Sequence, residues 1–443
     1  MTKKETYFAL STPSGRSATA TIRISGPNSK KTILKLFKNK NKKLEPGFNK
    51  VVSLYNKNND LIDKCVVVYY KSPKSFTGND MVEIHTHGNP VIVDTVSREL
   101  LGLGVRHADA GEFTRTALLN NKIDLIQAES LLSLINAKSI AGVQISNTNL
   151  TGALTKRFKK MRDLLIRTQG TLEYELDISE TENQKETSKQ ALNSLKEIYK
   201  KADALISSTK NARINIDGAR IVIFGEPNVG KSSVFNALLT YKRSIVTEIA
   251  GTTRDSIQER LNIGRHNIVL IDTAGIRNTK DRVEQLGIDR SNEEIKDADI
   301  LLHIVDATKN TDSEKRKNQL IVLNKIDLLS ENEIEVIKNT NSKTLFVSAK
   351  NKTGINLLIE KIEEKLSAIT NHNRNEHITS LRQEQLLVKV NKTILPIIKN
   401  QETNIEIIAH HTKEAIDHFD QLLGKTSVDD ILNDVFSNFC VGK

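Results

Sequence analysis

The sequence predicts a multidomain chain in which an α+β domain is followed by an α-helical domain, and an α/β domain interrupts the helical one. Three patterns lead to this prediction. Strand patterns and turn residues fill the first 118 residues, and apolar residues recur at helical spacing from about 112 to 212 and over 378–439. Between these helical stretches, strands and helices alternate from 219 to about 369, which is typical of a parallel sheet. A chain of 443 residues exceeds the usual size of one hydrophobic core, so several domains are expected.

The amino-terminal part, 1–118, is predicted to be the α+β domain. Its β-branched and aromatic residues cluster in short runs that Pro and Gly separate. The expected strands lie at 7–11, 18–24, 65–70 and 81–85. Two helices are expected among these strands, near 28–38 and 90–102.

The helical domain is expected in two pieces, 119–214 and 372–443. In the first piece, apolar residues such as Leu125 and Leu132 recur at the spacing of one helix face. Neither piece has a strong core pattern of its own, so we expect the two to pack together. The α/β domain, 215–371, is therefore predicted to be an insertion in the helical domain.

The charge balance of the chain is basic. Lysine and arginine number 65 against 54 acidic residues, which gives a net charge of +11. Such an excess is compatible with an RNA partner, because cations neutralise phosphates. Lysines without an acidic residue between them occur at Lys30, Lys31, Lys35, Lys38, Lys40, Lys42 and Lys43. Because the chain has no Trp and few aromatic residues for base stacking, we interpret this run as a solvated loop after a short helix.

Cysteine content and apolar runs indicate the cellular compartment in which the protein is expected. The two cysteines, Cys65 and Cys440, cannot form a disulfide framework. No apolar run approaches the roughly 20 residues that a membrane helix requires. The charged residues at the amino terminus are not followed by the apolar segment of a secretory signal. We therefore expect a cytoplasmic protein with no membrane segment.

The most specific motif is a phosphate-binding loop at the start of the α/β domain. A buried strand runs into Gly-Glu-Pro-Asn-Val-Gly-Lys-Ser at 225–232, and a helix-forming segment follows. Gly225 and Gly230 let the backbone wrap around phosphates, whose negative charge meets the amides of the loop and of the helix start. Lys231 is expected to reach the β and γ phosphates, and the Ser232 hydroxyl is expected to bind magnesium.

Further tetrads at strand ends favour GTP over ATP. Asp272 begins Asp-Thr-Ala-Gly and supplies a carboxylate for the magnesium shell, and the glycine of this tetrad supplies an amide for the γ-phosphate. Asp327 ends Asn-Lys-Ile-Asp, and its carboxylate can accept from the ring N–H and the exocyclic amine of guanine, a pair that adenine lacks. Ser-Ala-Lys at 348–350 follows the last strand and is expected to contact the base. The order and placement of these motifs predict a P-loop GTPase domain.

Two threonines between the phosphate loop and Asp272 are expected to close over the nucleotide. Thr252 and Thr253 lie in Ala-Gly-Thr-Thr-Arg-Asp, and Thr253 is the second predicted hydroxyl ligand of magnesium. The residues expected to contact GTP are Asn228, Val229, Gly230, Lys231, Ser232, Ser233, Thr247, Glu248, Ile249, Ala250, Gly251, Thr252, Thr253, Asp272, Thr273, Ala274, Gly275, Asn324, Lys325, Asp327, Ser348, Ala349 and Lys350.

The residue after Gly275 departs from many small GTPases, which place a Gln there to orient the attacking water. Here the residue is Ile276, whose side chain cannot hold a water molecule, so another group must assist hydrolysis. The polar residues nearby are Arg277, Asp281, Arg282 and Glu284. From the sequence alone, most of them are best interpreted as charges on a mobile switch segment.

Motifs outside the α/β domain point to one family. They are Ile-Arg-Ile-Ser-Gly-Pro at 22–27, Ser-Phe-Thr-Gly-Asn-Asp at 75–80, Gly-Glu-Phe-Thr-Arg at 111–115, the segments 119–125 and 127–129, and Phe-Cys-Val-Gly-Lys at 439–443. With the GTP motifs, they make the chain similar, nearly from end to end, to the MnmE (TrmE) family of tRNA-modifying GTPases. The resemblance implies a folate-binding and dimerisation domain at the amino terminus, a homodimer, and an FAD-dependent MnmG-like partner that completes a heterotetramer.

The reaction that the resemblance implies adds a carboxymethylaminomethyl or aminomethyl group to carbon 5 of the wobble uridine of tRNA. A tetrahydrofolate derivative, 5-formyl or 5,10-methylene, supplies the one-carbon unit, and GTP hydrolysis drives a conformational cycle. The implied folate contacts are Arg23, Glu83, Lys122 and Lys443. The family also implies potassium in place of an arginine finger. Its ligands would be Asn228, Thr247, Ile249 and Thr252, with Glu284 as the base that activates water.

Two other functions stay open at this point. One is a stand-alone GTPase switch in ribosome assembly, which would bind no folate. The other is a one-carbon transferase whose GTPase domain only regulates it, which predicts that tRNA modification survives an Asp272→Asn substitution.

Overall fold

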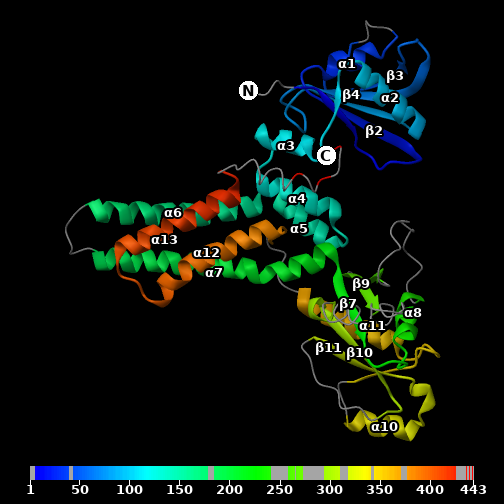
Figure 1. Cartoon of the computed structure of the whole chain (residues 1–443), viewed down its shortest axis with the longest axis vertical. Helices are drawn as coiled ribbons and strands as arrows, with labels where there is room; N and C mark the ends of the chain where they lie inside the picture. Colours follow the sequence, from blue (N-terminus) through cyan, green and yellow to red (C-terminus); the bar gives the residue numbers. More distant parts are fainter. Residues whose placement is uncertain are drawn as a thin grey trace, which may run out of the picture. The chain divides into compact units, whose positions relative to one another are not determined.

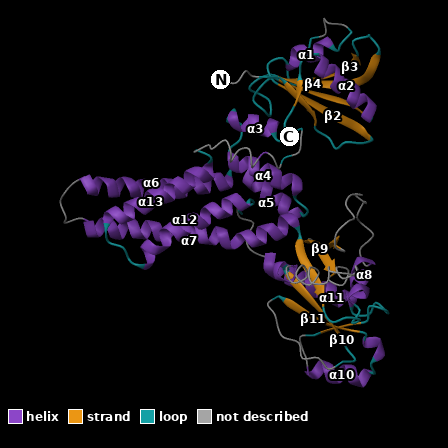
Figure 2. Cartoon of the chain, in the orientation of Figure 1, coloured by secondary structure: helices purple, strands orange, loops and turns teal. Residues whose placement is uncertain are grey.

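A computed structural model describes residues 5–38, 43–177, 184–240, 258–264, 266–272, 294–309, 318–340, 344–370 and 377–425, together with residues 436, 439 and 442. The chain divides into two compact units. The first unit comprises Met1–Leu132, Asn149–Ala202 and Gln385–Lys443, and the second comprises Ser133–Thr148 and Asp203–Glu384. Figures 1 and 2 show the elements of both units.

The first unit contains a six-stranded sheet in the order β3-β4-β5-β2-β1-β6. Its strands are β1 (Tyr7–Leu10), β2 (Ser17–Ser25), β3 (Asn49–Tyr55), β4 (Leu61–Tyr70), β5 (Met81–Gly88) and β6 (Arg106–His107). Helices α1 (Ser29–Lys35) and α2 (Pro90–Gly102) pack on one face of this sheet and bury residues such as Ile33 and Leu100 against it (Figure 1). The four predicted strands and two predicted helices are confirmed.

Strand β3 is absent from the sequence prediction. Its sequence, Asn-Lys-Val-Val-Ser-Leu-Tyr, contains two valines and a tyrosine, residue types that are enriched in strands, so the signal was present and was missed. It forms because it pairs along its whole length with β4, which buries Val52 and Leu54 in the core.

The first unit also contains most of the helical part. Its helices are α3 (Glu112–Leu119), the start of α4 (Leu125–Asn136), α6 (Ala153–Asp177), most of α7 (Gln184–Asp217), most of α12 (Leu381–Lys399), and α13 (Ile405–Leu423). Helices α6 and α13 lie side by side (Figure 2). The rings of Phe158 and Phe419 pack edge to face between them, with 6.4 Å between the ring centroids. Arg162 Nη2 donates to Asp420 Oδ2 at 3.1 Å across the same helix pair. Since α6 belongs to one predicted helical piece and α13 to the other, the prediction that the two pieces pack together is confirmed.

The second unit contains a six-stranded sheet in the order β12-β11-β10-β7-β9-β8. Its strands are β7 (Ala219–Phe224), β8 (Gln258–Ile263), β9 (His266–Asp272), β10 (Ile300–Asp306), β11 (Gln319–Asn324) and β12 (Leu345–Val347). All neighbours pair in parallel except β8, which is antiparallel to β9 and whose polar sequence gave no strand signal. Helices α8 (Lys231–Thr240) and α11 (Ile355–Thr370) contribute to the core on this sheet. The strands predicted to lead into the phosphate loop, Asp-Thr-Ala-Gly, Asn-Lys-Ile-Asp and Ser-Ala-Lys are confirmed as β7, β9, β11 and β12.

Shorter elements complete the second unit. Helix α10 (Glu331–Thr340) follows β11, and α5 (Ile140–Leu150) starts beside the end of α7, where the Lys138 amide donates to the Ile216 carbonyl at 2.8 Å. The predicted sequence of an α+β part, a helical part and an α/β part within the helical one is confirmed. The predicted domain borders stay predictions. Among the described helices, none is both long and apolar enough to span a bilayer.

Candidate functional site

Five parallel strands of the second unit bring the predicted nucleotide motifs to one edge of its sheet. Strands β7, β9, β10, β11 and β12 run in the same direction, so their carboxyl ends meet at that edge. In open α/β sheets, ligands bind in the crevice outside these carboxyl ends. The phosphate loop follows β7, Asp272 ends β9, and the guanine tetrad begins at the last residue of β11.

The backbone of the phosphate loop requires glycine at two positions. Gly230 has φ +92°, and a Cβ there would lie 2.3 Å from the Asn324 side-chain nitrogen. Gly225 has φ +150°, and its Cβ would lie 2.2 Å from the Ile304 carbonyl oxygen. Asn228 also adopts a left-handed φ of +63°, a conformation that Asn tolerates better than most residues. The loop is therefore held close to strands β10 and β11, with no room for larger residues at its glycines.

Lys231, Ser232 and Asp272 lie where the sequence predicts phosphate and magnesium contacts. The Lys231 ammonium donates to the Gly225 and Glu226 carbonyls at 3.0 and 2.7 Å, so it lies over its own loop. The Ser232 hydroxyl donates to Asp272 Oδ2 at 2.8 Å, and Asp272 is only 1% exposed. A hydroxyl beside a buried carboxylate is the hard oxygen donor set that magnesium prefers, so these two residues fit the ion.

Asn324 connects the guanine tetrad to the loops beside it. Its side-chain nitrogen donates to the Val229 carbonyl at 2.9 Å, and its side-chain oxygen accepts from the Ala349 amide at 3.0 Å. Asn324 itself is buried. One amide group thus ties together the phosphate loop, the end of β11 and the loop after β12.

Asp327 is held as an exposed, ionised acceptor. The Ser348 hydroxyl donates to its Oδ1 at 2.6 Å, and this hydrogen bond is the main cause that lowers the pKa of the Asp327 carboxyl. The Asp327 side chain is otherwise open to solvent. The arrangement keeps a carboxylate free to accept from a base, as the prediction of a guanine contact requires.

Asp306, at the end of β10, belongs to this edge and was not predicted. Lys325 Nζ donates to Asp306 Oδ2 at 2.7 Å and to the Asn228 carbonyl at 2.8 Å. Burial acts to raise the pKa of Asp306, but hydrogen bonds from Lys325 and Thr308 outweigh it and lower the pKa. The signal was present in the sequence, since Asp306 ends an apolar strand just as Asp272 does.

A second cluster of predicted residues lies on the sheet of the first unit. Arg23 on β2 is directly opposite Glu83 on β5, and Arg23 Nε donates to Glu83 Oε1 at 2.7 Å. Two residues that the sequence prediction did not assign to the folate contacts approach the other carboxylate oxygen of Glu83. The Tyr70 hydroxyl lies 3.4 Å from it and His85 Nε2 lies 3.7 Å from it. Burial, followed by the charge of Glu83, raises the pKa of Tyr70.

Lys122, another predicted folate contact, lies at a loop beside this sheet. Lys122 Nζ donates to the Pro73 carbonyl at 3.1 Å, in the loop between β4 and β5. Gly442, the residue before Lys443, has its carbonyl hydrogen-bonded to the Ser11 hydroxyl at 3.1 Å, just after β1. Gly442 therefore lies against the part of the chain that follows β1, in the sheet that carries Arg23 and Glu83.

Part of the predicted site lies outside the described residues, and the roles given to these residues stay predictions. They are Thr247, Glu248, Ile249, Ala250, Gly251, Thr252, Thr253, Thr273, Ala274, Gly275, Glu284 and Lys443.

Comparison with known proteins agrees with this arrangement of the chain. The family model described as the GTP-binding protein TrmE N-terminus matches residues 6–122, and the MnmE helical domain model matches residues 125–440. Curated relatives named tRNA modification GTPase MnmE align over nearly the whole chain. The protein of Aquifex aeolicus is 36% identical over 99% of this chain and 100% of its own length. That of Fervidobacterium nodosum is 38% identical over 99% and 98% of the two chains, and that of Thermotoga maritima is 38% identical over 99% and 100%. Full-length similarity at this level, together with two matching domain models, shows that the chain belongs to the MnmE (TrmE) family of tRNA modification GTPases.

Proposed function

We propose that the chain hydrolyses GTP as part of the modification of tRNA wobble uridine. One observation carries the GTPase part of the proposal. At a single sheet edge, a glycine-constrained loop lies beside the Ser232–Asp272 oxygen pair, and the ionised carboxylate of Asp327 follows β11 at the same edge. These groups supply, in order, a cradle for phosphates, ligands for magnesium and an acceptor for guanine.

Magnesium binding would rearrange the contacts of Ser232 and Lys231. Ser232 and Asp272 would take the ion and its water shell, with Thr253 as the further hydroxyl ligand, and their mutual hydrogen bond would open. Lys231 would turn from the Gly225 and Glu226 carbonyls to the β and γ phosphates. Charge on the phosphates would then be neutralised by one ammonium group and one divalent cation.

Potassium and Glu284 are proposed to replace the missing Gln and arginine finger. Asn228 lies in the phosphate loop with φ +63°, and its side-chain oxygen is of the hard type that potassium accepts. Thr247, Ile249 and Thr252 would complete the potassium site, and Glu284 would activate the attacking water.

We expect GTP turnover to be much faster in potassium chloride than in sodium chloride at equal ionic strength. Glu284→Ala should lower turnover by roughly 100-fold or more, because general-base catalysis contributes about 10²–10⁴-fold. The measurement is phosphate release by the purified full chain, with GTP affinity measured alongside as the control. Equal rates in the two salts would remove the potassium site and favour the simpler ribosome-assembly switch.

The amino-terminal sheet is proposed to hold the folate that supplies the one-carbon unit. Glu83 would accept from the pterin amine and ring N–H, with Arg23 beside it at the pterin end, and the cations Lys122 and Lys443 would bind the glutamate tail. Tyr70 and His85 would help to orient Glu83, since both lie close to its Oε2. An FAD-dependent MnmG-like partner, a homodimer, a heterotetramer and a cytoplasmic location complete the proposal.

Arg23→Ala is expected to weaken 5-formyltetrahydrofolate binding by about tenfold or more, because a charge-assisted contact contributes about 1.5–3 kcal/mol. Isothermal titration calorimetry of the full chain measures this change. Arg98→Ala removes an exposed arginine that pairs with Asp94 on α2, and it should leave folate affinity unchanged. Equal folate binding by Arg23→Ala and the unsubstituted protein would remove Arg23 from the site.

A further inference from the structure

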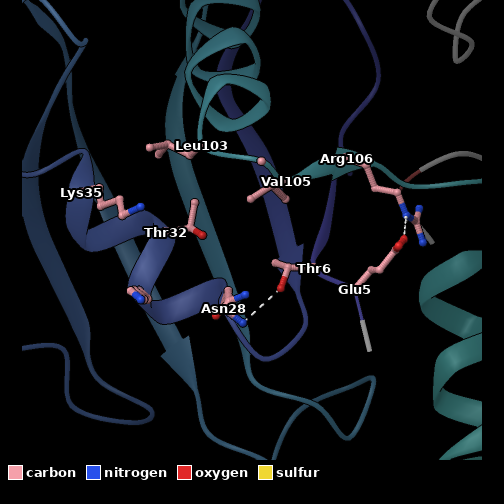
Figure 3. A pocket seen from close by; sticks show the side chains of 10 residues that line it. Glu5, Thr6, Asn28, Thr32, Lys35, Leu103, Val105 and Arg106 are labelled. Carbon is pink, nitrogen blue, oxygen red and sulfur yellow. Dashed lines mark hydrogen bonds and ion pairs between the residues drawn. The ribbon is translucent and has the colours of Figure 1, made fainter. Parts of the chain in front are cut away.

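A polar pocket of about 480 Å³ lies in the first unit, away from both clusters described above. It opens between α1, the amino end of β1 and the turn that joins α2 to β6 (Figure 3). On one side it is lined by Asn28, Lys31, Thr32 and Lys35, and on the other by Leu103 and Val105. We refer to this cavity as the α1 pocket.

Four lysines of the basic run, among the residues that the structure describes, divide into two kinds. Lys30 lies over the Tyr69 ring, 4.7 Å from its centroid, and Lys38 lies over the Tyr55 ring at 5.4 Å. Lys31 and Lys35, four residues apart on α1, instead line the pocket and are exposed. Neither forms an ion pair with any residue in the part of the chain that the structure describes. Their charges are therefore available to a ligand.

The acidic residue of the pocket is already neutralised. Glu5 Oε2 accepts from Arg106 Nε at 2.8 Å (Figure 3), and Arg106 also donates to Glu112 at 2.8 Å. Thr6 and Asn28, on the inner wall, are polar and uncharged. The Asn28 backbone amide donates to the Thr6 hydroxyl at 3.1 Å. The rim at Lys31 and Lys35 thus dominates the charge of the pocket, which favours an anion.

We propose that the α1 pocket binds a phosphodiester group of tRNA, with Lys31 and Lys35 as its cationic contacts. This inference rests on tRNA being the substrate under the proposed function. No aromatic side chain lines the pocket, so it offers phosphate contacts and hydroxyl contacts to the sugar but no stacking for a base. Contacts of this kind fix the position of an RNA without reading its sequence. From the sequence alone, this lysine run is interpreted as a solvated loop. In the structure, Lys31 and Lys35 lie on α1 and line one side of the pocket.

The test uses a fluorescein-labelled tRNA transcript, the full-length protein and a series of salt concentrations. The test variant is Lys31→Gln with Lys35→Gln. A matched control is Lys196→Gln with Lys200→Gln, which removes two exposed lysines at the same spacing from α7. The slope of log K for tRNA binding against log salt is negative, and loss of two phosphate contacts should reduce its magnitude by roughly 1.4–1.8. The affinity should fall by about tenfold in 0.15 M salt, while GTP turnover and the control variant stay unchanged.

Each other outcome has a distinct meaning. If the unsubstituted protein does not bind tRNA at all, the proposed function loses its substrate. If it binds tRNA and both double variants behave alike, the α1 pocket is not the tRNA contact and the inference is overturned. Uridine monophosphate is titrated separately by calorimetry. If it binds the unsubstituted protein but not the Lys31/Lys35 variant, and tRNA affinity is unaffected, the pocket serves a free nucleotide instead of tRNA.

Discussion

Replacing Asp327 with Asn is expected to weaken GTP binding by about 10²–10⁴-fold. The carboxylate would lose two hydrogen bonds from guanine, and hydrogen bonds to charged groups contribute about 1.5–3 kcal/mol each. Xanthine carries a carbonyl where guanine carries its amine, so the Asn amide can donate to it. The variant should therefore prefer xanthosine triphosphate, and competition against a fluorescent nucleotide measures both affinities.

Ser348→Ala tests the same contact with a smaller expected loss of GTP affinity. It removes the hydroxyl that donates to Asp327 at 2.6 Å, the main cause of the lowered pKa of that carboxyl. The carboxylate remains but loses the hydroxyl that helps to orient it, so a loss of about tenfold in GTP affinity is expected. Unchanged GTP affinity in Asp327→Asn would show that Asp327 does not contact the base.

Asp272→Asn is expected to reduce GTP hydrolysis by about 100-fold or more. Asp272 is 1% exposed and faces Ser232, so the substitution removes a carboxylate from the predicted magnesium shell while preserving its size. A bound metal contributes several kcal/mol to stabilisation of transition-state charge, and each 1.36 kcal/mol is tenfold in rate. Single-turnover hydrolysis across a magnesium titration should show both a lower rate and a higher magnesium requirement.

Asp306→Asn provides a matched control at the same edge, because it changes one carboxylate that pairs with Lys325 and is not predicted to touch magnesium. Its magnesium requirement should match that of the unsubstituted protein.

The Asp272→Asn variant also separates two proposals about tRNA. Loss of wobble-uridine modification supports a cycle driven by hydrolysis. Modification that persists at the normal rate would instead favour a one-carbon transferase that its GTPase domain only regulates.

Strong local patterns explain which elements were predictable from the sequence. Apolar runs such as those of β7 and β9 are buried on both faces, so composition alone identifies them as strands. Strand β8 lies at a sheet edge and carries many polar residues, and it forms because the neighbouring strand β9 offers its backbone groups. Edge strands of this kind depend on pairing more than on propensity, which a local pattern does not encode.

The candidate sites divide in the same way. Motif spacing identified Lys231, Ser232, Asp272 and Asp327, because each needs a particular residue at the end of a strand or the start of a helix. Asp306 ends an apolar strand as Asp272 does, and the prediction missed it. Tyr70 and His85 carry no motif, and they gain a role only from lying close to Glu83. The same holds for Lys31 and Lys35, which line the α1 pocket, whereas Lys30 on the same helix lies over the Tyr69 ring.

By itself, the sequence determined the order of the folded parts, the chemical groups available for phosphate, magnesium and guanine, and the basic charge of the chain. Only the tertiary structure decided which of these groups meet. Ser232 and Asp272 are 40 residues apart in the chain and 2.8 Å apart in space. The physical reason is that side-chain proximity depends on strand order and register, here β12-β11-β10-β7-β9-β8. Those depend on the burial of whole faces of the sheet, whereas a motif reports only its own few residues.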